Sequence, residues 1–134
     1  MNIYLDLENV LINKYQLSDF GEVFLQQILT TCPYSTYYFV QKNQDTDVSI
    51  QQLVKYVTKR RTLEQITRLN PAIWSEAKTD AIDFHEPFLW YDSDIFSEEI
   101  EILTHYHASA CYRQINLTKD PTQLMDETVY LRNF

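Results

Sequence analysis

The chain has 134 residues, of which 45% are hydrophobic, and this predicts one folded domain over residues 1–134. Its formal net charge of −8 argues against a protein that coats DNA or RNA, because binding to nucleic-acid phosphates requires clustered Lys and Arg. No hydrophobic run approaches the roughly 20 residues that cross a membrane, and the chain starts without a signal-peptide pattern. We therefore expect no membrane partner and, with only two cysteines, a reducing cytoplasmic location.

The first half of the sequence predicts two strands and three helices. In chain order we expect a strand at residues 2–6, a helix after Ser18 that buries Phe20, Val23, Phe24 and Ile28, a strand at 35–41, a helix that buries Ile50, Leu53, Val54 and Val57, and a short helix at 61–69 that ends before Pro71. The chain contains a single glycine. Turns with positive φ are therefore expected to use Asn or Asp, and a glycine-rich phosphate loop is excluded.

The second half predicts two more strands and two more helices. In chain order we expect a strand at 87–91 that is apolar on both faces, a helix that buries Phe96, Ile100 and Leu103, a strand at 110–117, and a helix started by Asp120, Pro121, Thr122 and Gln123. Strands that alternate with helices indicate a single three-layer Rossmann-like α/β domain, with a mostly parallel sheet, helices on both faces and no large cap domain.

Two of the expected strands end in acidic residues. Asp6 and Glu8 follow the first strand, and Asp92 and Asp94 follow the third. Carboxyl ends of adjacent parallel strands meet at one edge of a sheet, where clustered acids repel unless a cation or protons compensate. The pattern predicts a site for a hard divalent cation such as Mg²⁺. The alternative is that these acids are solvated strand ends, with Ser93 or Asp94 capping the next helix.

These residues resemble motifs of the haloacid dehalogenase-like superfamily. Asp6, Glu8 and Asn9, after a strand, are similar to its first motif, Asp-x-Asp-Gly-Val-Leu. Lys78, followed by a strand that ends in Asp92 and Asp94, is similar to its basic residue and its terminal acidic motif. The resemblance covers nearly the whole chain in the order of elements, and it fits the small members that have no cap.

The resemblance implies a Mg²⁺-dependent phosphohydrolase that acts on a phosphorylated small molecule or macromolecule. Asp6 would be the nucleophile, and Glu8 would act as general acid and base. Lys78 would neutralise the phosphoryl group. Asp6, Glu8, Asp92 and Asp94 would hold the cation.

The sequence departs from that superfamily at three points. Glu8 is one methylene longer than the aspartate of the motif, and Asn9 replaces its glycine. The second strand should end in Ser or Thr to donate to the phosphoryl group, but this chain offers Gln41 or Asn43. The departures predict activity that is weak or lost.

Two alternatives remain open. The chain can be a non-catalytic domain of the same fold that binds a partner. It can also be a metal-dependent ribonuclease of the PIN or NYN type, whose opening the residues from Asp6 to Asn9 also resemble. That class needs three or four acids around its cations, which Asp45, Asp47, Glu76 and Asp80 could supply. The sequence does not indicate the oligomeric state.

Overall fold

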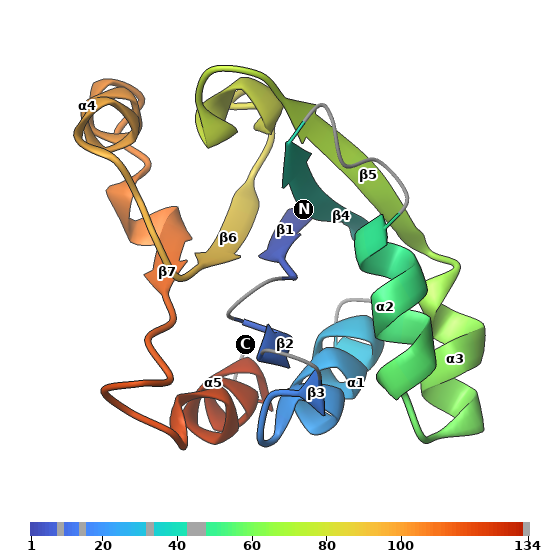
Figure 1. The fold of residues 1–134 in the computed structure, drawn as a ribbon. Coiled ribbons are helices and arrows are strands. Elements are labelled where there is room, and N and C mark those ends of the chain that lie inside the picture. Colours follow the sequence, from blue (N-terminus) through green and yellow to red (C-terminus); the bar gives the residue numbers. More distant parts are fainter. Residues whose placement is uncertain (8–9, 14–15, 32–33, 43–47, 133–134) are drawn as a thin grey trace.

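The protein folds around a five-stranded sheet in which every pair of neighbouring strands is parallel. We describe a computed structural model, which covers residues 1–7, 10–13, 16–31, 34–42 and 48–132. The strands are β1 (Asn2–Asp6), β4 (Thr36–Lys42), β5 (Leu69–Trp74), β6 (Phe88–Asp92) and β7 (Tyr112–Gln114). Their order across the sheet is β5-β4-β1-β6-β7 (Figure 1). The predicted Rossmann-like α/β domain is confirmed.

Helices cover both faces of this sheet. The helices are α1 (Gly21–Thr31), α2 (Val48–Tyr56), α3 (Arg60–Ile66), α4 (Ser97–His105) and α5 (Gln123–Arg132), and two short 3₁₀ helices are η1 (Lys78–Ala81) and η2 (Ser109–Cys111). Two further short strands, β2 (Ile12–Asn13) and β3 (Gln16–Leu17), pair with each other in antiparallel fashion. Figure 1 shows α1, α2, α3 and α5 grouped together, with α4 apart from them. No helix in the described ranges is long and apolar enough to cross a membrane.

Two hydrophobic clusters form the core, one on each face of the sheet. Strand residues such as Ile3, Leu5 and Tyr91 pack under the group of four helices. Tyr4 and Trp90, which alternate with them along β1 and β6, pack under η1 and α4. All five residues of β6 are buried, as the sequence predicts for a strand covered on both faces.

The edge strand β5 was not predicted from the sequence. We expected the helix at 61–69 to be followed by a break at Pro71, but α3 ends at Ile66 and Leu69 begins a strand. Pro71 lies opposite Phe39 in the register with β4. Proline has no N–H to donate to a neighbouring strand, and an edge strand tolerates this because one of its sides has no partner. The edge position explains how a proline fits inside β5.

The buried faces of two helices are rotated from the predicted ones. In α1 the buried residues include Phe24, Leu25, Ile28 and Leu29, whereas Phe20 and Val23 are exposed. In α4 the buried residues are Glu99 and Leu103, and both Phe96 and Ile100 are exposed. Val54 of α2 is exposed as well, next to the buried Leu53. In each of these helices, hydrophobic residues at helical spacing extend beyond the buried face on both sides. The sequence therefore did not show which of them would face the core.

The last helix starts later than its capping sequence predicts. α5 begins at Gln123, three residues after Asp120. Asp120 Oδ1 instead accepts the backbone N–H of Thr122 at 3.3 Å, which forms a local turn. Gln123 uses its side chain to reach the end of β7, where Nε2 donates to the Gln114 carbonyl at 2.6 Å. The polar side chains at this helix start therefore fix the connection from β7 as well as the helix.

The end of α4 uses a histidine where a glycine is usual. His107 has φ of 54°, and its N–H donates to the Thr104 carbonyl, while the N–H of Ala108 donates to the Leu103 carbonyl. This is the Schellman arrangement, which favours glycine at the left-handed position. Among the described residues only Phe20 and His107 have positive φ, so the expectation that Asn or Asp would occupy such turns is wrong there.

Replacing this histidine with glycine should stabilise the protein. A left-handed backbone costs a non-glycine residue about 1–2 kcal/mol, and glycine loses about 0.5–1 kcal/mol through its greater freedom in the unfolded chain. We expect His107→Gly to raise the free energy of unfolding by about 0.5–1 kcal/mol in a urea titration. The control is His105→Gly in the last turn of α4, which should lower it by about 1 kcal/mol. A lower urea midpoint for His107→Gly would contradict the expectation.

Candidate functional site

The two acidic strand ends lie side by side at the point where the strand order reverses. From β1 the chain proceeds outward to β4 and β5, and then returns to β6 and β7 on the other side of β1. Leu5 pairs with Tyr91 in the parallel register of β1 and β6, so the next residues, Asp6 and Asp92, end the two strands at the same edge. Ligands of open α/β sheets bind at such a reversal, outside the carboxyl ends of the strands.

Lys78 brings a positive charge to these acids. Residue alternation puts Asp6 on the same face as Tyr4, and Asp92 on the same face as Trp90, which is the face that η1 and α4 cover. Lys78 is the first residue of η1, and its Nζ lies 2.9 Å from Asp92 Oδ1. The same Nζ donates to the Asp94 carbonyl oxygen at 3.1 Å. The structure thus brings together the lysine and the acids of both strand ends.

The electrostatics of the site favour positive charge. Burial of the Lys78 ammonium group lowers its pKa, but the charge and hydrogen bond of Asp92 and the charges of Asp6 and Glu99 outweigh this effect, so the pKa is raised. The pKa of the Tyr112 phenol is also raised, first by burial and then by the negative charges of Asp92 and its acidic neighbours. The cluster therefore keeps Lys78 positively charged and the Tyr112 phenol protonated.

Asp92 is buried and its hydrogen bonds are all made inside the protein. Its side chain is 0% exposed, against 13% for Lys78. Oδ1 accepts the Lys78 ammonium and the backbone N–H of Asp94 at 3.1 Å, and Oδ2 accepts the Trp90 indole N–H at 3.2 Å. A buried carboxylate is tolerated when it is paired and hydrogen-bonded in this way. Asp92 therefore has a clear structural role, whatever ligand the site takes.

Glu99 is a site residue that the sequence analysis did not identify. It is 0% exposed, and its Oε2 accepts the backbone N–H of Lys78 at 2.6 Å while Oε1 accepts the N–H of Phe96 at 2.9 Å. Glu99 therefore holds the start of η1 against the start of α4. The helix cap is Phe96, so the alternative in which Ser93 or Asp94 caps this helix is wrong. Three-residue spacing from the helix start was the signal in the sequence, because a glutamate there reaches back to the cap.

Some predicted site residues fall outside what the structure describes. Glu8 and Asn43 lie outside the described residues, and so do Asp45 and Asp47. Gln41 belongs to β4 and pairs with Ile73 of β5, but its side chain is outside the described part. The phosphate-binding role assigned to Gln41 and Asn43 therefore stays a prediction.

The described residues supply carboxylates for a cation but no complete set of ligands. Over these residues there is no group of three His, Cys, Asp or Glu side chains that could hold a metal ion. Asp6 and Asp92 end adjacent strands, and Asp94 is exposed two residues after Asp92. This donor set fits Mg²⁺, which is commonly held by one or two carboxylates together with water and substrate phosphate.

The Lys78–Asp92 ion pair should be worth far more than a surface ion pair. Asp92→Asn would leave the buried ammonium group of Lys78 without its partner, which typically costs about 3–5 kcal/mol of unfolding free energy. The matched control is Glu64→Gln, because the Arg60–Glu64 pair is also charged but both of its side chains are largely exposed. That change should cost less than about 1 kcal/mol. Similar losses for the two variants in urea titrations would contradict this ranking.

Comparison with known proteins identifies no relative of this chain. No protein-family model matches it, and no curated protein or solved structure matches it either. The resemblance to the haloacid dehalogenase-like superfamily therefore rests on the motifs around Asp6, Lys78 and Asp92 alone.

Proposed function

We propose that the chain is a haloacid dehalogenase-like domain that binds a phosphorylated ligand and Mg²⁺ at the carboxyl ends of β1 and β6. The observation that carries the proposal is the position of Lys78, whose ammonium group pairs with Asp92 at 2.9 Å and whose pKa is raised in part by Asp6. A lysine beside a strand-end aspartate can neutralise both that aspartate and a phosphoryl group approaching it.

The chemistry available to this set of residues is phosphoryl transfer through an aspartyl-phosphate. A carboxylate oxygen of Asp6 would attack phosphorus, forming an O–P bond as the bond to the leaving alcohol breaks. The alcohol oxygen would take a proton from Glu8. Water would then attack the aspartyl-phosphate, give a proton to Glu8 and release inorganic phosphate and Asp6. Lys78 would stabilise the negative charge on the phosphoryl oxygens in both steps.

Mg²⁺ is the cation that this donor set suits best. Carboxylate oxygens are hard ligands, and those of Asp6, Asp92 and Asp94 are the candidates among the described residues. Glu8 would contribute from the same strand end. When bound, the cation would supply Lewis-acid stabilisation of the transferring phosphoryl group.

We propose that turnover is weak. Glu8 is longer than the aspartate of the superfamily motif, and a displacement of about 1 Å can cost roughly a hundredfold in rate. An amide at Gln41 or Asn43 would have to replace a hydroxyl donor, and loss of one oriented donor costs about 10²- to 10³-fold. These departures would lower the rate of hydrolysis more than they would weaken binding of a phosphorylated ligand.

A non-catalytic binding domain is the second candidate, and one observation favours it. Lys78 already neutralises Asp92 from within the protein, so the acidic cluster can exist in the folded chain without a cation. A site that is electrostatically satisfied in this way can be retained for binding alone. The ribonuclease alternative gains no comparable support from the described residues. Of its candidate acids there, Glu76 precedes η1, and Asp80 lies within η1 and accepts the Glu76 N–H through Oδ2 at 3.3 Å.

Mg²⁺ binding should depend on Asp6. We expect calorimetric titration of the full chain to show that Asp6→Asn weakens Mg²⁺ binding by roughly tenfold or more, because even residues behind metal ligands change affinity by about 10- to 100-fold. The control is Asp19→Asn, an exposed acid before α1, which should leave the affinity unchanged. Equal affinities for wild type and Asp6→Asn would show that the cation, if bound, binds elsewhere.

Hydrolysis of phosphomonoesters should be near background, and its rate should depend on the side-chain length of the acid at position 8. We expect an assay with Mg²⁺ and a panel of phosphomonoesters to give weak turnover in the wild type. Glu8→Asp should increase turnover by up to about a hundredfold, because the substitution restores the shorter side chain of the superfamily motif. Adding Asp6→Asn to that variant is the control and should abolish the gain. Robust wild-type turnover lost in Asp6→Asn would show that the departures do not impair the site.

A further inference from the structure

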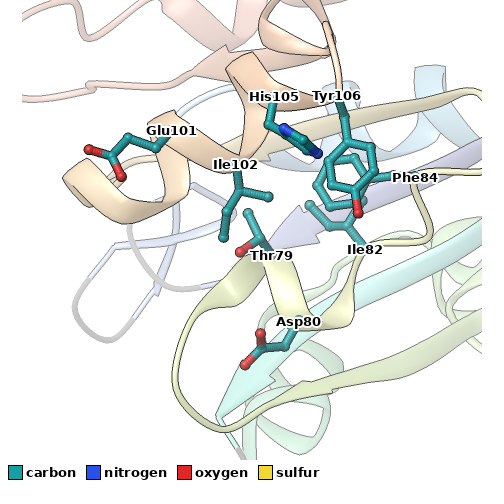
Figure 2. A pocket seen from close by; sticks show the side chains of 8 residues that line it. All are labelled: Thr79, Asp80, Ile82, Phe84, Glu101, Ile102, His105 and Tyr106. Carbon is teal, nitrogen blue, oxygen red and sulfur yellow. The ribbon is translucent and has the colours of Figure 1, made fainter.

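A groove lies between η1 and α4, next to the acidic site but separate from it. Its volume is about 510 Å³, and neither Asp6, Lys78 nor Asp92 lines it. Figure 2 shows its walls, which come from the segment around η1 below and from α4 above. The volume is within the range of about 300–1,000 Å³ that is typical of small-molecule sites.

One end of the groove is aromatic and apolar. The rings of Phe84 and Tyr106 stack with centroids 4.3 Å apart and an angle of 8° between their planes, and the His105 ring meets Tyr106 edge-on at 5.0 Å. Ile82, directly after η1, and Ile102 of α4 continue this surface. The Tyr106 side chain is 50% exposed, so a ligand can reach it. This end offers an apolar surface to a ring or an alkyl chain.

The remaining walls are acidic. Asp80 and Glu101 line the groove from η1 and from α4, and both are exposed (Figure 2). The backbone N–H of Ala77 donates to Asp80 Oδ2 at 3.1 Å, which holds this carboxylate at the start of η1. Among the described residues that line the groove there is no Lys or Arg. The charges of Asp80 and Glu101 would therefore repel a ligand with a carboxylate or phosphate group.

Thr79 adds an unused hydrogen-bonding group. Its side chain projects from η1 toward α4 in Figure 2, and the residue is only 5% exposed. The Thr79 hydroxyl is buried and has no hydrogen-bond partner in the protein. A buried polar group left in this state destabilises the fold, so a ligand that donates a hydrogen bond to it would remove that penalty.

We propose that this groove binds a small organic amine with an aromatic or alkyl body. The body packs on Phe84 and Tyr106, and the ammonium group is attracted by the charges of Asp80 and Glu101 and can donate to the Thr79 hydroxyl. Opposite charges and the mixed apolar and polar walls select this class over acids and neutral molecules. The proposal does not rest on phosphoryl chemistry at Asp6.

The test is a titration of the full ¹⁵N-labelled chain with tryptamine and 2-phenylethylamine, followed by amide chemical shifts. We expect saturable shifts at residues 79–84 and 101–106. Tryptophol, the neutral alcohol, should bind about tenfold more weakly than tryptamine, because a hydrogen bond from a charged donor is stronger than one from a neutral donor. Indole-3-propionate, the acid, should not bind. No saturable shift with either amine, or equal binding of the acid, would overturn the proposal.

Two glutamates of α4 provide matched variants. Glu101→Gln removes a charge from the groove and should weaken tryptamine binding by about tenfold. Glu98→Gln removes the same charge from an exposed position outside the groove, and it should change the affinity by less than about twofold. Thr79→Val should weaken binding with unchanged shifts elsewhere. Both variants should first be shown to keep the wild-type urea midpoint. If they then weaken tryptamine binding equally, the amine is attracted by the overall negative charge of the protein, and the proposed site is wrong.

Discussion

The ion pair between Lys78 and Asp92 fixes the connection that crosses back over the sheet. After β5 the chain must return past β4 and β1 to reach β6, and it does so through η1, a helix of only four residues. So short a helix buries little apolar surface of its own. Its first residue is instead held by Asp92 through its side chain at 2.9 Å and by Glu99 through its backbone at 2.6 Å. Polar contacts thus replace much of the packing that a longer helix would supply.

This arrangement makes the two faces of the sheet unequal. Four α-helices cover one face, while η1 and α4 cover the other. Aromatic side chains fill the thinner layer. Tyr4 and Phe88 pack edge to face at 6.0 Å, Phe84 and Phe88 at 5.6 Å, and Trp90 and Tyr112 at 4.8 Å. These large rings bury much of the apolar surface on this face, and the groove lies beside them between η1 and α4.

The sequence determined the strand ends better than the sheet edge or the helix faces. The first strand was predicted at its observed bounds, and the pairing of Asp6 and Asp92 at one edge followed from two apolar runs that each end in acidic residues. The edge strand β5 was missed because Pro71 argues against a strand unless its neighbours are known. Burial of Glu99 was equally hidden, since a glutamate in a first helical turn is ordinarily solvated and only the tertiary position of Lys78 gives it a buried partner.

Substitutions at the two strand-end acids, Asp6 and Asp92, should have different consequences because the two side chains differ in burial. Asp92 is fully buried and accepts three hydrogen bonds, so its replacement disturbs Trp90, the start of the next loop and η1 together. Any loss of ligand binding in an Asp92 variant would therefore mix a local effect with a weakened fold. Asp6 is only partly buried at the end of a strand held by two neighbours, β4 and β6. Substitutions at Asp6 thus report on the chemistry of the site more directly than substitutions at Asp92.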